Sequence, residues 1–196
     1  MNKLYILTGK SSSGKSTAER HLVEQYGIKS LVLNTTRPKR PHEKDGTDYN
    51  FVTDAQFNKM ALNDEFIYNT IFNAYTEDGG DLQSWQYGLK KIDLDSDSVV
   101  VTDIDHVKVI KDYYESVGVE VIVIYFMATI ETREERARKR QGNEFSLDEW
   151  IRRTMDEMRC YTIDKIVDLC DYVVDNEKEG AIEEFFKEVI ANASIS

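Results

Sequence analysis

The chain has 196 residues, the length of one domain or of one domain with a small insertion. Hydrophobic residues make up 41% of it and aromatic residues 11%, which is enough for a buried core and excludes a disordered chain. The formal net charge of −11 disfavours non-specific binding to nucleic acid or to an anionic membrane surface.

The longest apolar run, residues 121–127, is far shorter than the roughly 18 residues that a membrane-spanning helix needs. The N-terminus shows no export signal, that is, no charged start followed by an apolar stretch and a small-residue cleavage site. The two cysteines do not suggest a disulfide framework. We therefore expect a cytoplasmic protein with no nucleic-acid or membrane partner, and the sequence leaves monomer and homodimer both open.

In the first half of the chain, apolar segments alternate with Gly-rich and polar ones. The capping box of Thr53 and Gln56 predicts the start of a helix. The elements that we expect here are a strand at 4–8, a Gly/Ser-rich loop at 9–14, a helix at 15–26, a strand at 31–33, a loop-rich stretch at 34–50, a helix from Thr53 to Leu62 and an exposed loop at 73–86.

The second half repeats the alternation of strand and helix. Ser146 and Glu149 have the spacing of another capping box. The elements that we expect are strands at 99–103, 119–127 and 172–174, and helices at 105–116, 130–140, 146–159 and 179–191. Such alternation predicts an α/β domain with a mainly parallel sheet core flanked by helices.

The positive charge is concentrated in two segments. Residues 37–44 and 133–159 together hold 12 of the 25 basic residues. One interpretation is a pocket for a small polyanion. The other is a set of solvated helix faces with ion pairs between residues four positions apart.

Residues 9–16, Gly-Lys-Ser-Ser-Ser-Gly-Lys-Ser, match the phosphate-loop pattern G-x-x-x-x-G-K-[ST] at every fixed position. The motif lies between a predicted strand and a predicted helix, which is the context it requires. Its glycines allow backbone N–H groups to approach phosphate oxygens, and the helix N-terminus adds partial positive charge. The alternative is a Ser-rich turn that only caps a helix.

A phosphate loop of this kind predicts an ATP site with Mg²⁺ as cofactor. Lys15 is expected to reach the β- and γ-phosphates, and the Ser16 hydroxyl to ligate Mg²⁺. The full set of expected ATP-binding residues is Gly9, Ser11, Ser12, Ser13, Gly14, Lys15, Ser16 and Thr17.

Asp103 ends a predicted strand, and the carboxyl end of a parallel strand faces the crevice where ligands bind. We expect Asp103 to hold Mg²⁺ through water. Asp105 follows two residues later and has two interpretations, a second carboxylate at the site or a cap of the next helix.

The segment 35–52, Thr-Thr-Arg-Pro-Lys-Arg-Pro-His-Glu-Lys-Asp-Gly-Thr-Asp-Tyr-Asn-Phe-Val, resembles the guanylate kinase pattern T-T-R-x-P-R-x-G-E-x-x-G-x-D-Y-x-F-V. Weaker similarity continues at 63–67, at 103–105, in the Arg-rich helix and at Arg152-Arg153. The resemblance implies the fold of the phosphate-loop nucleoside monophosphate (NMP) kinases, with a small NMP-binding insertion and a helical lid. It implies a core of residues 1–34 and 89–196, a lid at about 130–155 and an NMP-binding subdomain at 35–88.

The resemblance also implies roles for single residues. The positions that match Arg37, Arg40 and Tyr49 hold the phosphate of the acceptor nucleotide, which agrees with the preference of a dianionic phosphate for forked arginines and a phenol. Arg136, Arg140 and Arg153 match arginines that close over the ATP phosphates, so we expect them to be catalytic together with Lys15. Glu43 and Tyr87 match further positions of the family pattern on the acceptor side.

The sequence departs from the family pattern where the acceptor base is recognised. Tyr68 follows Phe66-Ile67, where the family has a glutamate that accepts N–H bonds from guanine, and a tyrosine offers no bidentate acceptor. Two explanations remain open: an acid of the neighbouring segment substitutes, or the preferred base is not guanine. The candidate acids are Glu77, Asp78 and Asp81. Asp105 also matches a base-side acid of the family, and we expect Asp103 to be an NMP-binding residue as well.

The function expected from these residues is phosphoryl transfer from ATP to (d)GMP or a related (d)NMP. The acceptor is already an oxyanion, so positioning and charge stabilisation suffice for catalysis. Two alternatives stay open: a catalytically inactive, guanylate-kinase-like module that binds a protein, and a phosphate-loop kinase for another small metabolite.

Overall fold

The computed structural model describes residues 2–40, 43–75 and 82–193. The chain divides into two compact units. The larger unit comprises residues 1–29 and 96–196, and the smaller unit residues 30–95. Within the described residues, no helix is both long enough and apolar enough to cross a membrane.

The larger unit is built on a five-stranded sheet with the order β2-β7-β1-β8-β9. Strand β1 pairs in parallel with β7 on one side and with β8 on the other, and β8 pairs in parallel with β9. The strands are β1 (Lys3–Thr8), β2 (Lys29–Ser30), β7 (Ser98–Val101), β8 (Glu120–Met127) and β9 (Tyr172–Asp175). The prediction of an α/β fold with a mainly parallel sheet is therefore confirmed.

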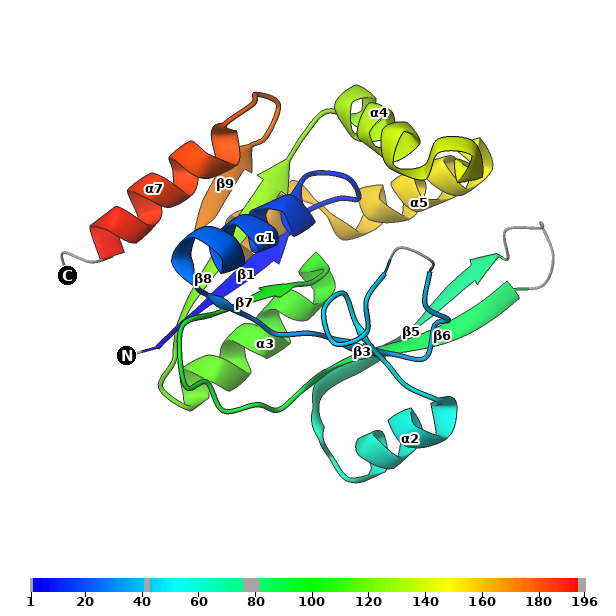
Figure 1. Ribbon diagram of the computed structural model, residues 1–196, viewed down its shortest axis with the longest axis horizontal. Coiled ribbons are helices and arrows are strands. Elements are labelled where there is room, and N and C mark those ends of the chain that lie inside the picture. The colour runs from blue at the N-terminus through cyan, green and yellow to red at the C-terminus, as the bar shows by residue number, and fades with distance from the viewer. Residues whose placement is uncertain (1, 41–42, 76–81, 194–196) are drawn as a thin grey trace. The chain divides into compact units, whose positions relative to one another are not determined.

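Helices cover both faces of this sheet because successive strand residues point to opposite sides. Ile124 and Phe126 of β8 belong to a buried cluster that also contains side chains of α1 and α7, whereas Tyr125 packs with Ile104 and Tyr161. Figure 1 shows these helices around the strands. They are α1 (Lys15–Tyr26), α3 (Ile104–Ser116), α4 (Ile130–Gln141), α5 (Leu147–Cys160), α6 (Ile163–Leu169) and α7 (Ala181–Ala193), with a 3₁₀ turn at Gly142–Glu144.

The smaller unit has a four-stranded sheet with the order β4-β3-β6-β5. Its main part is an antiparallel hairpin of β5 (Phe66–Tyr75) and β6 (Leu82–Lys90), and two short strands, β3 (Asn34–Thr35) and β4 (Asn50–Phe51), complete it. Helix α2 (Asp54–Leu62) packs on the sheet through Phe57, whose ring stacks on Phe66 at 4.6 Å between centroids. Gly88 permits this packing, since a Cβ there would lie 2.9 Å from the Phe66 ring.

Local signals located most helices correctly. Helix α1 has the predicted bounds and ends at Gly27, which adopts a left-handed conformation with φ 68°. Thr53 and Gln56 form the predicted capping box of α2. The box predicted for α5 is only half formed: Ser146 accepts the Glu149 N–H, but the Glu149 carboxylate binds arginines instead.

Two predictions of local structure were wrong. Residues 31–33 form no strand: they separate β2 from β3, and the Asn50 N–H that donates to the Leu33 carbonyl belongs to the pairing of β3 with β4, which begins at Asn34. The segment 73–86 is not a loop where it is described, since residues 73–75 and 82–86 belong to the hairpin; the acids Glu77, Asp78 and Asp81 lie outside the described residues. Of the two interpretations left open for Asp105, the N-cap is not the one seen, because Asp103 occupies the N-cap position of α3 and Asp105 lies in its first turn.

Candidate active site

The phosphate loop connects β1, the central strand of the larger sheet, to α1 (Figure 1). Its two motif glycines have no room for a side chain: a Cβ on Gly9 would lie 2.4 Å from the Phe126 carbonyl oxygen, and one on Gly14 would lie 2.1 Å from Asn176 Nδ2. Both have positive φ angles, 148° and 110°. Gly14 is the N-cap of α1 and makes no side-chain cap, which leaves the helix N-terminus to an anion.

Lys15 lies across this loop. Its Nζ donates to the Gly9 carbonyl at 2.5 Å and to the Lys10 carbonyl at 3.0 Å. Burial lowers the pKa of Lys15, and the charges of Asp103 and Glu157 oppose this shift. The nearby Ser13 hydroxyl is buried and has no hydrogen-bond partner among the described residues. The loop therefore presents a cationic group and an unused hydroxyl, both suited to phosphate oxygens.

The expected metal ligands, Ser16 and Asp103, are both exposed, one at the start of α1 and one at the start of α3. Since β1 and β7 are parallel neighbours, their carboxyl ends bring these two helix starts to the same edge of the sheet. Asp105 lies in the first turn of α3, where its carboxylate pairs with Lys165 at 2.5 Å.

Tyr161, which the sequence analysis did not single out, connects three parts of this edge. Its hydroxyl donates to the Gly9 carbonyl at 2.9 Å and lies 3.4 Å from both Thr8 Oγ1 and Asp103 Oδ1. Burial and the charge of Asp103 raise its pKa, so the phenol stays protonated and can donate. No local pattern marks this residue, since all three partners are more than 50 residues away in the sequence.

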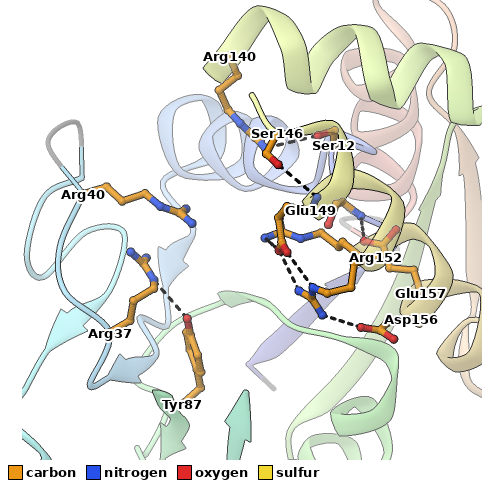
Figure 2. A network of polar contacts seen from close by, with 12 residues as sticks. Ser12, Arg37, Arg40, Tyr87, Arg140, Ser146, Glu149, Arg152, Asp156 and Glu157 are labelled. Atoms are coloured by element: carbon orange, nitrogen blue, oxygen red, sulfur yellow. Dashed lines mark hydrogen bonds and ion pairs between the residues drawn. The ribbon is translucent and has the colours of Figure 1, made fainter. Parts of the chain in front are cut away.

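Helix α4 directs a row of arginines at the phosphate loop. Arg133, Arg136 and Arg140 are spaced three and four residues apart, so they share one face of the helix. Arg140 Nη2 lies 3.4 Å from Ser12 Oγ (Figure 2). Arg133 forms an ion pair with Glu157 at 2.9 Å. Arg136 donates to the Asn176 carbonyl at 2.7 Å.

The turn after β9 supports both the loop and α4. Asn176 Nδ2 donates to the Ser13 carbonyl at 2.8 Å. The Glu177 carboxylate accepts hydrogen bonds from the Thr129 N–H and, at 2.6 Å, from the Thr132 hydroxyl at the start of α4. Asn176 follows the carboxyl end of a strand, which is a signal that could have identified it.

A cavity of about 630 Å³ opens between these elements. The lining residues come from the phosphate loop, the start of α1, the arginine face of α4 and the turn between β9 and α7; they are Ser12, Gly14, Lys15, Ser16, Thr17, Arg136, Arg140, Asn176, Glu177, Lys178, Glu179, Gly180, Ile182 and Glu183. No local sequence motif could have revealed this cavity, because its walls come from segments that are distant in the sequence.

The arginines of α5 have carboxylate partners on their own helix. Arg152 pairs with Glu149 and Asp156, at 2.7 and 2.8 Å, as Figure 2 shows. Arg153, one of the expected catalytic residues, lies 3.4 Å from Glu149. The hydrogen bond from Arg152, followed by the charges of both arginines, outweighs burial and lowers the pKa of Glu149. The ion-pair interpretation of the basic segments thus holds for Arg152.

In the smaller unit, Arg37 and Glu43 form a buried pair within the basic segment. Arg37 Nη2 donates to Glu43 at 2.7 Å and Nη1 to the Pro38 carbonyl at 2.9 Å. Its Nε donates to the Tyr87 hydroxyl at 3.2 Å (Figure 2). The second Glu43 oxygen accepts the Arg40 N–H at 2.8 Å. Glu43 therefore shapes this segment, while the Arg40 side chain remains 49% exposed.

Aromatic rings surround the Arg37 guanidinium. Its carbon lies 5.4 Å from the Tyr49 ring centroid, and Tyr87 contacts the rings of Tyr49 and Phe72 edge to face. The hairpin register pairs Tyr68 with Leu89 and Thr70 with Tyr87. Tyr68 and Tyr87 therefore point to the same face of the hairpin.

A central-strand phosphate loop on a parallel sheet, with an arginine-bearing helix above it, defines the class of phosphate-loop NMP kinases. The family model of guanylate kinase matches residues 1–192. The chain is 31% identical to guanylate kinase of Legionella pneumophila (strain Paris) over 195 residues, which covers 96% of this chain and 86% of that protein. The chain belongs to the guanylate kinase family.

Further comparisons agree with this assignment. The guanylate kinase of Thermotoga maritima is 38% identical over 66 residues, which cover 33% of this chain and 32% of that protein. The crystal structure of guanylate kinase from Anaplasma phagocytophilum has the same fold, with a TM-score of 0.62 at 22% identity, and the match covers 99% of this chain and 85% of that one.

Proposed function

We propose that the protein transfers the γ-phosphoryl group of ATP to the phosphate of (d)GMP or a related (d)NMP. An oxygen of the acceptor phosphate attacks the γ-phosphorus, and the bond to the β–γ bridging oxygen breaks, which yields ADP and a nucleoside diphosphate. The observation that carries this proposal is the phosphate loop, in which Lys15, the unpartnered Ser13 hydroxyl and the uncapped N-terminus of α1 converge.

On the ATP side, residues 11–17 surround the phosphates and bind them through backbone N–H groups other than those of Ser11, Ser13 and Thr17, which donate within the protein. Lys15 contacts the β- and γ-phosphates. The cavity of about 630 Å³ beside the loop has the size to hold the nucleoside. Arg136 and Arg140 line this cavity and neutralise the charge that spreads over the transferring group. Arg153 joins them when its contact with Glu149 opens.

The residues at the sheet edge fit Mg²⁺. A serine hydroxyl and a carboxylate are hard oxygen ligands, and both Ser16 and Asp103 are exposed. Among the described residues no group of three or more His, Cys, Asp or Glu side chains is arranged to hold a metal. When bound, Mg²⁺ supplies charge neutralisation between the β- and γ-phosphates.

On the acceptor side, we assign the phosphate to Arg37, Arg40, Tyr49 and Tyr87. Arg37 uses three of its five N–H groups in the hydrogen bonds described above, and Glu43 holds it in place. We assign the base to the neighbourhood of Tyr68, with Asp103 and Asp105 as further contacts. We also assign residues 35–88 to NMP binding, residues 1–34 and 89–196 to the kinase core, and residues 130–155 to a lid that excludes water during transfer.

A panel assay tests this function. The protein is incubated with ATP, Mg²⁺ and each common ribo- and deoxynucleoside monophosphate in turn, and ADP formation is measured with a coupled enzyme. We expect ADP to form only with an acceptor present, fastest with (d)GMP or a closely related nucleotide. ADP formation that does not depend on any acceptor, or none with the whole panel, contradicts the proposal.

A further inference from the structure

Glu157 makes a contact that the chemistry above does not use. Its Oε1 accepts the backbone N–H of Ser11 at 2.6 Å, in the middle of the phosphate loop, and its Oε2 accepts Arg133 Nη1 at 2.9 Å. The same Arg133 nitrogen lies 3.3 Å from the Ser11 carbonyl oxygen. The backbone N–H and the backbone carbonyl of Ser11 are therefore both held by side chains, from helices α5 and α4 respectively.

The pair of Arg133 and Glu157 is buried. Their side chains are 4% and 12% exposed, and the Arg133 guanidinium carbon lies 5.6 Å from the centroid of the Trp150 ring. A buried pair of this kind is held in one geometry, because moving either charge leaves the other without a partner in a low-dielectric environment. Glu157 is consequently a fixed acceptor rather than a mobile surface carboxylate.

The contact also sets the register of α4 against the loop. Arg133 is the first of the three arginines on one face of α4, and Arg136 and Arg140, which line the cavity, follow on that face. Holding Arg133 at Ser11 places Arg140 beside Ser12. The same carboxylate thus orients the loop and the helix that faces it.

We propose that Glu157 is a positioning residue, whose hydrogen bond to the Ser11 N–H fixes the phosphate loop in the shape that grips a nucleotide. This inference rests on the proposed function, since the nucleotide in question is ATP or ADP. The carboxylate touches no reacting atom. It acts through the Ser11 peptide, and Arg133 offsets its negative charge beside the triphosphate.

The test compares Glu157→Ala, which removes the acceptor, with Glu157→Gln, which retains an oxygen for the Ser11 N–H. Asp156→Asn is the matched control, because Asp156 is the neighbouring carboxylate on α5 and its partner Arg152 is at the surface. Affinity for Mg²⁺·ADP is measured by calorimetry without acceptor, KM and kcat are measured for ATP and acceptor, and thermal unfolding is followed in parallel.

We expect Glu157→Ala to weaken ADP binding and raise KM for ATP by about tenfold, the effect of one hydrogen bond to a charged group. In ADP affinity and KM for ATP, Glu157→Gln is expected to stay within about threefold of wild type, while its unfolding temperature falls because Arg133 loses its counter-charge. Asp156→Asn is expected to match wild type, and KM for the acceptor to change in none of the variants. If Glu157→Ala does not fold, Glu157→Asp, which withdraws the carboxylate by one methylene, replaces it.

Two results would overturn the inference. One is a lower unfolding temperature for Glu157→Ala with unchanged ADP affinity and unchanged KM for ATP, which is the signature of a purely structural pair. The other is equal impairment of the alanine and glutamine variants. If the wild-type protein itself binds neither ADP nor ATP, the proposed function fails, and the inference fails with it.

Discussion

Arg37 and Glu43 form an ion pair of 2.7 Å, Nη2 to Oε1, in which both side chains are only 7% exposed. Burial alone would raise the pKa of Glu43, but the hydrogen bonds from Arg37 and from the Arg40 backbone outweigh it, and the pKa is lowered from its ordinary value of 4.5. A carboxylate with a lowered pKa stabilises the fold above 4.5, and this contribution is lost as the pH falls through the folded-state value.

We therefore predict that Glu43→Gln destabilises the smaller unit at neutral pH by about 3–5 kcal/mol, because it leaves Arg37 buried without a counter-charge. The variant should also lose the part of the acid dependence below pH 4.5 that Glu43 contributes. The measurement is acid and urea unfolding followed by Trp85 fluorescence in a Trp150→Phe background. Glu65→Gln, which removes a solvent-accessible ion pair with Lys90 in the same unit, should leave stability close to that of wild type.

Arg40 allows a test of acceptor binding that leaves the fold intact. Its side chain is 49% exposed and lies 3.8 Å from Glu43, so Arg40→Ala removes a cation without uncovering a buried charge. We expect KM for the nucleoside monophosphate to rise by about tenfold or more, with KM for ATP unchanged, since a charged hydrogen bond contributes about 1.5–3 kcal/mol. Arg37→Ala should raise the same KM and also lower stability. An unchanged acceptor KM in Arg40→Ala contradicts the assignment, and Lys44→Ala is the control.

Of the substitutions considered, Lys15→Ala is expected to lower turnover most. Lys15→Ala removes the cation that faces the β- and γ-phosphates, and loss of a group that stabilises transition-state charge costs about 10²–10³ in kcat. Steady-state kinetics with saturating ATP and acceptor measure this effect. The control is Lys10→Ala in the same loop. Lys10 contacts Lys15 through its backbone carbonyl, which alanine retains, so turnover should stay near the wild-type level. Turnover that survives in Lys15→Ala would refute the role of the loop in catalysis.

A substitution of Gly14 tests whether the loop needs a glycine there because a side chain has no room, and not only because the φ angle is positive. A methyl group there meets Asn176 Nδ2 at 2.1 Å, so Gly14→Ala must displace the side chain that holds the Ser13 carbonyl. We expect loss of ADP binding in calorimetry together with lower stability. Gly27→Ala is the matched control: its φ of 68° is also positive, but a Cβ there meets nothing within 4 Å, so only about 1–2 kcal/mol of strain and no loss of binding are expected.

Short-range patterns predicted the parts of this fold that depend on neighbouring residues. The phosphate loop, α1 and the capping box of α2 are each specified within about a dozen residues, and the structure has them where the sequence placed them. No strand was predicted at residues 66–72, because a hairpin strand becomes stable only through its partner, here residues 85–90.

The contacts that support the candidate site were not predictable from the sequence, because they join distant segments. Glu157 and Ser11 are 146 positions apart, and Tyr161 and Gly9 are 152 positions apart. A single sequence also cannot distinguish an arginine that pairs on its own helix, such as Arg152, from one that reaches the loop, such as Arg140. Geometry alone separates them.

The two consecutive residues Asn176 and Glu177 make contacts with three parts of the site. The Asn176 side-chain amide donates to the Ser13 carbonyl, and the Asn176 backbone carbonyl accepts a hydrogen bond from Arg136. The Glu177 carboxylate accepts hydrogen bonds from Thr129 and Thr132 at the start of α4. An inserted or deleted residue here would shift one of these anchors by the length of a peptide unit, about 3.8 Å, and break at least one of them. The connection between β9 and α7 should therefore keep a constant length among functional variants of this chain, even where its amino acids are exchanged.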